Sequence, residues 1–327
     1  MQAQPRSILL TGGAGFVGPL LARAVAREWP QARRAALTRA GEAAPSPDWS
    51  LVFADLTEPA SIEAAIESVA PDLVLHLAAQ SSIAEALEGA QATWAVNCLG
   101  AFHLGAALAR HAPAATVLFV SSGDVYGGAF AQGSVDETAV PQPLNAYARS
   151  KLAAEGVLRD VLRPEARLIC ARSFNHTGPR QDRRFVLPSF AAQIAAAERG
   201  AQEARIKVGN LDARRDFLHV DDVVEAYMAL LRVSHTLPRR ALYNVASGRA
   251  HTIGSLLHRL LAHARTRCET RVDPTRLRPS DVPLAVGDAG RLREATGWRP
   301  QRSLDVMLCD LLDYWRGQPI TKSPSRR

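Results

Sequence analysis

The sequence predicts an α/β protein whose core is a doubly wound parallel sheet, joined to a smaller mixed α/β domain. Two observations lead to this prediction. In the first half, short apolar runs alternate with longer helical segments at the spacing of βαβ units. After residue 172 the polar loops lengthen and helices interrupt them, which indicates a second domain. The 327 residues, 47% of them hydrophobic and 22% charged, have the composition of an ordinary globular chain.

The individual elements follow from the same patterns. We expect strands at residues 7–10, 34–37, 51–54, 73–77, 117–120 and 242–245, and helices at 19–28, 61–69, 93–110, 145–162, 185–199, 221–231 and 256–264. Residues 1–172 then form the first domain, and residues 213–247 return to it. Residues 173–212 and 248–318 form the second domain, and 319–327 are expected to be a disordered tail.

Composition argues against several functional classes. The net charge is +7, but the arginines are spread along the chain and few aromatic residues lie among them, so nucleic-acid binding is not expected. We found no apolar run of about 18 residues, so no membrane span is expected. The four cysteines form no Cys-x-x-Cys pair, which favours a cytoplasmic chain with neither a metal site nor a disulfide framework; they are Cys98, Cys170, Cys268 and Cys309.

A glycine-rich loop lies between the first strand and the first helix. Gly12, Gly15 and Gly18 are spaced three apart and enclose Phe16 and Val17. Glycines at this spacing allow a tight turn, close approach of the backbone to a pyrophosphate, and close helix–strand packing. The helix N-terminus then faces the phosphates. The loop therefore predicts a Rossmann-type dinucleotide site.

The end of the second strand favours one form of the dinucleotide. An acid that binds the adenosine ribose of NAD is usual there, but this chain has Thr38 and Arg39 instead. An arginine can hold a 2′-phosphate, so we expect NADP(H), with NAD(H) possible. Asp55, after the third strand, is a candidate partner for the adenine amino group.

Three residues suggest proton-transfer chemistry. Tyr147 and Lys151 are four apart on a predicted helix and so share a face, and Ser122 ends a predicted strand. A free tyrosine has a pKa near 10. We expect the Lys151 cation, together with an oxidised nicotinamide, to lower the pKa of Tyr147. Tyr147 then exchanges a proton with a substrate oxygen that Ser122 orients.

These motifs, with Leu77-Ala78-Ala79, resemble those of the extended short-chain dehydrogenase/reductases over nearly the whole chain. The resemblance implies that Tyr147 is the acid/base, that Lys151 also binds the nicotinamide ribose, and that Ser122 positions the substrate. The residues expected to bind cofactor are Gly12, Gly15, Phe16, Val17, Gly18, Arg39, Asp55, Leu56, Leu77, Ala78, Ala79, Tyr147 and Lys151.

Later segments, at residues 172–179, 185–186, 209–217 and 276–281, are similar to the branch of that family that acts on GDP-linked 4-keto-6-deoxy sugars. The resemblance is strongest to its 4-ketoreductases, and the GDP-mannose 4,6-dehydratases are near relatives. It implies a substrate site formed by Ser81, Asn175, Val186, Asn210, Arg215 and Arg278. Cationic forks of this kind match diphosphate oxygens well. Taken singly, Arg215 and Arg278 could instead pair with Asp216 and Asp281.

Four activities remain open at this point. The favoured one is NADPH-dependent reduction of a C4 ketone, with a rhamno or talo product. A 4,6-dehydratase needs a second acid/base, and Asp124 stands where that branch has a longer glutamate. The glycine loop also lacks the Gly-Gln-Asp-Gly sequence of the dehydratases. The others are an NAD-dependent nucleotide-sugar epimerase and a non-catalytic nucleotide sensor.

The family resemblance also implies a homodimer. Its helices at residues 93–110 and 145–162 would pair with their copies as a four-helix bundle. Small residues in both segments would permit close helix approach; they are Ala101, Ala106, Ala107, Ala153 and Ala154.

Overall fold

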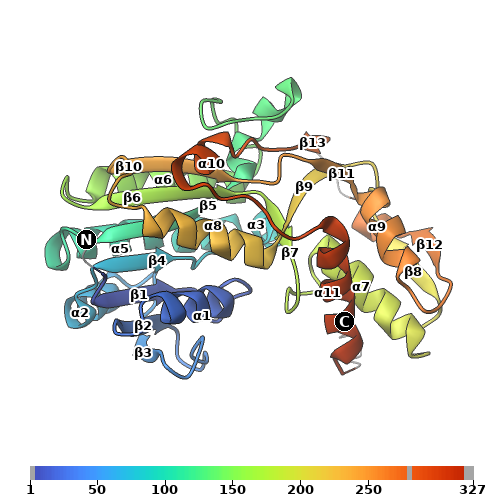
Figure 1. Ribbon diagram of the computed structural model, residues 1–327, viewed down its shortest axis with the longest axis horizontal. Coiled ribbons are helices and arrows are strands. Elements are labelled where there is room, and N and C mark those ends of the chain that lie inside the picture. The colour runs from blue at the N-terminus through green and yellow to red at the C-terminus, as the bar shows by residue number, and fades with distance from the viewer. Residues whose placement is uncertain (1–3, 278–281, 320–327) are drawn as a thin grey trace.

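The computed structural model describes residues 4–277 and 282–319 and contains a seven-stranded parallel sheet (Figure 1). The strand order is β10-β6-β5-β4-β1-β2-β3. The bounds are β1 Ser7–Thr11, β2 Arg33–Thr38, β3 Ser50–Phe53, β4 Leu73–His76, β5 Thr116–Ser122, β6 Arg167–Ser173 and β10 Arg240–Val245. This confirms the predicted doubly wound α/β fold. Six of the seven strands were expected, with boundaries that differ by a few residues, and β6 was not among the expected strands.

Helices cover both faces of this sheet because successive strand residues face opposite sides. Ile8 and Leu10 of β1 pack in the core that holds α1 and α8, whereas Leu9 packs in the core of α2, α5 and α6. The helices of the first domain are α1 Gly18–Glu28, α2 Pro59–Val69, α3 Ile83–Glu88, α4 Ala90–Trp94, α5 Gly100–His111, α6 Ala146–Val161, α8 Val220–Arg232 and α10 Gly290–Thr296. Short 3-10 turns follow β5 at Gly123–Tyr126 and Gly128–Gln132.

The second domain lies beside the carboxyl ends of the strands (Figure 1). A small sheet contains β9 Arg214–His219 between β11 Ala250–Thr252 and β13 Leu284–Ala285, and β7 Asn175–Thr177 also pairs with β9. β8 Arg205–Val208 pairs with β12 Glu269–Val272. Three helices enclose a separate apolar core; they are α7 Val186–Glu198, α9 Ile253–Ala262 and α11 Leu304–Gly317.

Two segments lie in a different domain from the one that we expected. Residues 213–247 return to the first domain only in part, because β9 pairs with β7, β11 and β13 rather than with the main sheet. Conversely α10, expected in the second domain, packs against α8 and β10 of the first. Leu292 of α10 is fully buried in the core beside the sheet. The domain to which α10 belongs is therefore determined by its apolar face and not by its position in the sequence. Nearly all of the tail expected at 319–327 lies outside the described residues.

The helix expected at residues 93–110 extends from Ala90 to His111, with a π-helical turn at Ala95–Leu99 between α4 and α5. By length and composition alone this helix could cross a membrane, a possibility that our inspection for apolar runs did not detect. It packs along α2 and α6, as a core helix does. Its outer face exposes Trp94, Leu99 and Phe102, which are 37%, 53% and 42% exposed.

Three of the five small residues that suggested helix pairing between subunits lie inside the subunit instead. Ala101, Ala107 and Ala154 are buried in the core between α2, α5 and α6. They permit close approach of helices within the chain, as does Gly105, where an added Cβ would lie 2.5 Å from the Val161 side chain.

Candidate active site

The glycine loop has the tight geometry that its sequence predicts. Gly12 has a φ of +73°, and a Cβ there would lie 2.6 Å from the backbone nitrogen of Ala78. A Cβ on Gly18 would lie 2.3 Å from the Gly13 carbonyl oxygen. Gly15, by contrast, is exposed at the turn. The first turn of α1 has no side-chain cap and no acidic residue. Its backbone donors are therefore well placed for an anion.

Phe16 of this loop contacts the second domain. Its ring stacks on that of His176, with centroids 5.9 Å apart and planes 8° apart. The His176 ring is also within hydrogen-bonding distance of the Phe174 carbonyl, and burial lowers its pKa. His176 is thus a packed residue of β7.

The end of β2 does carry a carboxylate, supplied from three residues further along the chain. The Arg39 guanidinium donates to Glu42 Oε1 from Nε at 3.1 Å and from Nη2 at 2.8 Å. Glu42 also accepts from the Thr38 hydroxyl and the Arg39 backbone. The expectation that no acid stands here was wrong, because the turn folds Glu42 back. The i,i+3 spacing from Arg39 is the signal that could have revealed it.

Asp55 lies close enough to Arg39 for their charges to interact. Its Oδ1 accepts from the backbone and hydroxyl of Thr57 at 2.8 and 2.7 Å, and these bonds lower the pKa of Asp55. One carboxylate oxygen is thus occupied by a local turn. The neighbouring Leu56 is buried.

The β4 edge of the site is fixed by buried hydrogen bonds. Thr11 accepts from the backbone of Ala78 at 3.2 Å and bonds the ring of His76 at 2.7 Å. Asn97, in the π-helical turn, binds both the N–H and the C=O of Gln80. Sequence reasoning missed Asn97, although a polar residue within an apolar helix is a usable signal. These bonds hold residues 77–80, including Leu77 and Ala79, beside the glycine loop.

Ser122, Asp124 and Tyr147 lie together at the end of β5. Burial raises the pKa of Tyr147, the Asp124 charge raises it further, and a hydrogen bond with Ser122 opposes the rise. The Ser122 hydroxyl also accepts from the Asp124 backbone at 3.1 Å. The Asp124 charge therefore acts on the Tyr147 phenol. Burial raises the pKa of Asp124 as well, whereas Arg215 lowers it.

Lys151 lies one turn along α6 from Tyr147 and is 3% exposed. Its ammonium donates to the Val120 carbonyl at 2.6 Å and lies 4.7 Å from the centre of the Phe119 ring. Burial lowers the pKa of Lys151 to about 8. We had expected Lys151 to lower the pKa of Tyr147, but the groups that shift it are Asp124, Ser122 and Tyr227.

The expected substrate residues come from several elements. The charge of Arg215 on β9 interacts with that of Asp124, and Asp216 accepts from Ser247 and Gly248. Asn175 begins β7 and Val186 begins α7; both are exposed, as is Ser81 before α3. Arg278 lies outside the described residues.

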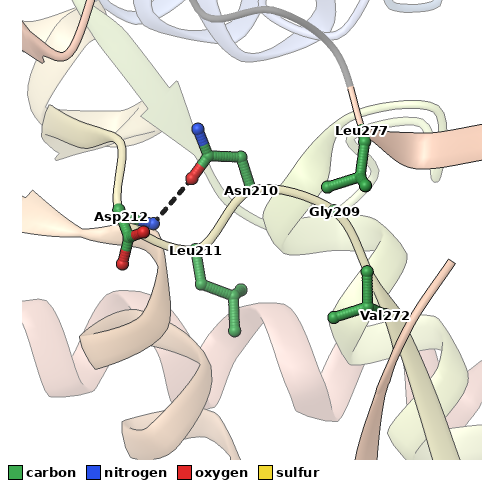
Figure 2. A pocket seen from close by; sticks show the side chains of 6 residues that line it. All are labelled: Gly209, Asn210, Leu211, Asp212, Val272 and Leu277. Carbon is green, nitrogen blue, oxygen red and sulfur yellow. Dashed lines mark hydrogen bonds between the residues drawn. The ribbon is translucent and has the colours of Figure 1, made fainter. Parts of the chain in front are cut away.

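Asn210 borders a cavity of about 430 Å³ in the second domain. The cavity is lined by Gly209, Asn210, Leu211, Asp212, Val272 and Leu277. Figure 2 shows that Asn210 turns its amide oxygen back onto the loop, where it accepts from the Asp212 backbone at 2.9 Å. Its amide nitrogen lies on the side away from that bond (Figure 2). The cavity thus has an apolar wall, from Leu211, Val272 and Leu277, and a polar rim.

Comparison with known proteins identifies the family of this chain. A family model described as GDP-mannose 4,6 dehydratase matches residues 9–311. The chain belongs to this family. It is 38% identical to GDP-6-deoxy-D-mannose reductase of Pseudomonas aeruginosa, over 95% of this chain and 97% of that protein. It is 29% identical to GDP-mannose 4,6 dehydratase 2 of Arabidopsis thaliana, over 80% of this chain and 70% of that one.

Solved structures of related proteins have the same fold. The structure of RMD from Pseudomonas aeruginosa complexed with NADPH superposes with a TM-score of 0.77 at 36% identity, over 95% of this chain and 99% of that chain. UDP-glucose 4-epimerase of Thermus thermophilus in complex with NAD gives 0.82 at 28% identity, over 95% and 99%. As a member of the GDP-mannose 4,6-dehydratase family, the chain thus has relatives with three activities, a reductase, a dehydratase and an epimerase, and the site must distinguish among them.

Proposed function

We propose that this protein is an NADPH-dependent oxidoreductase that reduces the C4 ketone of a GDP-linked 4-keto-6-deoxyhexose. The observation that carries the proposal is the 38% identity to a GDP-6-deoxy-D-mannose reductase over 95% of the chain. The grouping of Ser122, Tyr147 and Lys151 supports it, because these residues are the machinery that ketone reduction requires.

The glycine loop fits a dinucleotide. Side chains on Gly12 and Gly18 would collide with the backbone, so the loop is built for close approach. The uncapped start of α1 suits the pyrophosphate. Arg39 would face the 2′-phosphate, Asp55 and Leu56 the adenine end, residues 77–79 the middle of the dinucleotide, and Lys151 the nicotinamide ribose. The relative solved with NADPH favours NADP(H), and the relative solved with NAD keeps NAD(H) as an option.

Reduction then needs three contributions. NADPH, when bound by the residues named above, would supply the hydride for C4. Tyr147 donates its phenolic proton to the carbonyl oxygen, so that the C=O becomes CH–OH. Ser122 holds that oxygen by a hydrogen bond, which fixes the distance over which the proton moves. Burial raises the pKa of Tyr147, so the phenol keeps its proton until the carbonyl oxygen of the substrate develops negative charge.

The substrate would lie between the two domains. Arg215 and Arg278 would hold the diphosphate or nucleoside, and Asn175 the sugar-side phosphate. Val186 and Asn210 would contact the nucleoside, and Ser81 the sugar. The cavity at Asn210 supports a nucleoside position, because its apolar wall and polar rim suit a planar base with polar edges.

A GDP-mannose 4,6-dehydratase is the second candidate, and Asp124 is the observation that favours it. Its charge acts on Tyr147, so it lies near the reacting centre. In a dehydratase this group would remove the C5 proton and assist loss of the C6 hydroxyl. Burial raises the pKa of Asp124 and so makes it a stronger base, and the charge of Arg215 opposes only part of that rise. Against a dehydratase, the Asp124 side chain is one methylene shorter than the glutamate expected at this position in that branch.

One experiment separates the two activities. Purified enzyme is incubated with GDP-mannose, and separately with GDP-4-keto-6-deoxymannose plus NADPH, with products identified by NMR. We expect NADPH oxidation and a 6-deoxy product in the second mixture, and GDP-mannose unchanged in the first. Asp124→Asn should keep ketone reduction, and Asp136→Asn, at an exposed acid in a nearby loop, is the matched control. Conversion of GDP-mannose that disappears in Asp124→Asn would identify a dehydratase.

The same incubations address the remaining alternatives. An epimerase would interconvert sugars with no net NADPH oxidation, and a sensor would bind nucleotide without turnover. We further propose a homodimer formed through residues 90–111 and 146–161, supported by the exposed Trp94, Leu99 and Phe102. A cytoplasmic location is supported by the four free cysteines.

A further inference from the structure

Three side chains on successive turns of helix α6 make polar contacts with the end of β5. Tyr147, Lys151 and Glu155 are spaced by four and lie along one face of α6. They meet Ser122, the carbonyl of Val120 and the hydroxyl of Ser121, which are successive residues of β5. The first two contacts belong to the proposed catalytic site. The third, made by Glu155, is not used by the mechanism.

Glu155 is a buried carboxylate with all of its close partners in place. Oε1 accepts from the Ser121 hydroxyl at 2.5 Å and from Arg172 Nε at 3.0 Å, and Oε2 accepts from Arg172 Nη2 at 2.7 Å. Glu155 and Arg172 are both 4% exposed. Arg172 lies opposite Ser121 in the β5–β6 register, and its guanidinium lies 4.8 Å from the centre of the Tyr126 ring. The carboxylate is thus held at one position.

Stability alone gives little reason for such a pair. Exchanging a buried ion pair for apolar residues of similar volume is often neutral or even stabilising. The position of Glu155, one helical turn beyond Lys151, suggests another role. We propose that Glu155 is a positioning residue that keeps the ammonium of Lys151 charged and directed at the end of β5. This inference rests on the proposed role of Lys151 in the reductase site.

The surroundings of Lys151 support this role. Burial lowers the pKa of Lys151 to about 8, while Glu155 and Cys170 raise it. Burial raises the pKa of the Cys170 thiol, so Cys170 carries no charge at neutral pH. His76 also faces Lys151, and its pKa is lowered to about 3, so it is neutral as well. The phenol of Tyr147 is protonated there. Of the groups that act on Lys151, Glu155 therefore carries the negative charge that favours the ammonium, and Arg172, which pairs with Glu155, offsets part of that charge.

The test measures NADPH binding by fluorescence between pH 6 and 10, so it does not depend on the sugar substrate. In the wild type we expect affinity to fall above about pH 8, as Lys151 loses its proton. In Glu155→Gln the midpoint should move to lower pH by about one unit or more, the size of shift that a nearby opposite charge produces. Lys151→Met should remove the transition.

Two further variants separate positioning from folding. Glu155→Leu combined with Arg172→Met replaces the buried pair by apolar side chains, and it should fold and show the same acid shift. Glu198→Gln is the matched control, because Glu198 forms a similar two-point pair with Arg316 in the second domain, at 2.8 and 2.7 Å. It should lower the melting temperature and leave the midpoint unchanged.

The outcomes are distinct. An unchanged midpoint in the folded Glu155 variants, or a midpoint that survives Lys151→Met, would overturn the inference. If the midpoint shifts as expected but no ketone is reduced, the inference about Glu155 stands and the proposed function fails.

Discussion

The contact between Arg39 and Glu42 makes cofactor choice a quantitative prediction. To bind a 2′-phosphate, Arg39 must leave Glu42 or share its guanidinium with the new anion. Arg39 is 71% exposed, and an exposed ion pair is worth about 0.2–1 kcal/mol. A hydrogen bond to a charged group is worth about 1.5–3 kcal/mol. The difference leaves about 1–2 kcal/mol in favour of NADPH, or roughly 5–30-fold in affinity.

Two single variants and their double variant test this estimate. Arg39→Ala should weaken NADPH binding by roughly 5–30-fold and leave NADH within about twofold. Glu42→Gln should have the opposite effect on NADPH, because it releases Arg39 and removes a carboxylate that repels the phosphate. Dissociation constants for both cofactors, measured by fluorescence or calorimetry at fixed salt, complete a double-mutant cycle.

Two results of these measurements would refute the proposed role of Arg39. Equal losses for both cofactors in Arg39→Ala would mean that Arg39 supports the loop and not the phosphate. The second result is a wild type that prefers NADH, together with weaker NADH binding in Glu42→Gln. That pair of observations would mean that Glu42 binds the ribose, as the acid of an NAD enzyme does.

Three further predictions concern catalysis, assembly and the phosphate loop. Tyr147→Phe should reduce the turnover of ketone substrate by orders of magnitude with little change in NADPH affinity, and a near-normal rate would show that another group donates the proton. Phe102→Glu should convert a dimer into a monomer in light scattering at micromolar concentration, and a wild-type monomer would refute the dimer itself. Gly18→Ala should weaken NADPH and NADH alike, because its Cβ would lie 2.3 Å from a backbone oxygen; unchanged affinities would mean that the loop can relax.

Sequence patterns predicted best those features that local geometry determines. The glycine spacing led directly to the loop, since a side chain at Gly12 would be strained at its φ and would collide with the Ala78 backbone, and one at Gly18 would collide with the Gly13 carbonyl. Tyr147 and Lys151 could be placed on one face because a helix repeats every 3.6 residues. Short apolar runs predicted six of the seven strands of the main sheet, because strands of a parallel sheet are buried on both faces.

Features that depend on how the chain turns back or packs on itself were missed. Glu42 reaches Arg39 through a local turn, and we did not use the i,i+3 spacing that could have revealed the pair. α10 looked like part of the second domain because of its position in the chain, but its buried face packs on α8 and β10. Ala101, Ala107 and Ala154 suggested contacts between subunits, although their burial lies within one chain. Small residues on a helix indicate close packing, but they do not indicate whether the partner helix lies in the same subunit or in another.

The charges around Tyr147 bear on the direction of reaction. A dehydratase or an epimerase begins by oxidising the sugar, which requires Tyr147 to accept a proton, so a lowered pKa would favour that first step. Burial and Asp124 instead raise the pKa of Tyr147, and the Lys151 ammonium is bonded to the Val120 carbonyl. Reduction begins with the phenol protonated. The reduced nicotinamide is neutral, so it adds no positive charge that would lower the pKa of Tyr147. The polypeptide therefore holds Tyr147 in the form from which a ketone reductase starts its reaction.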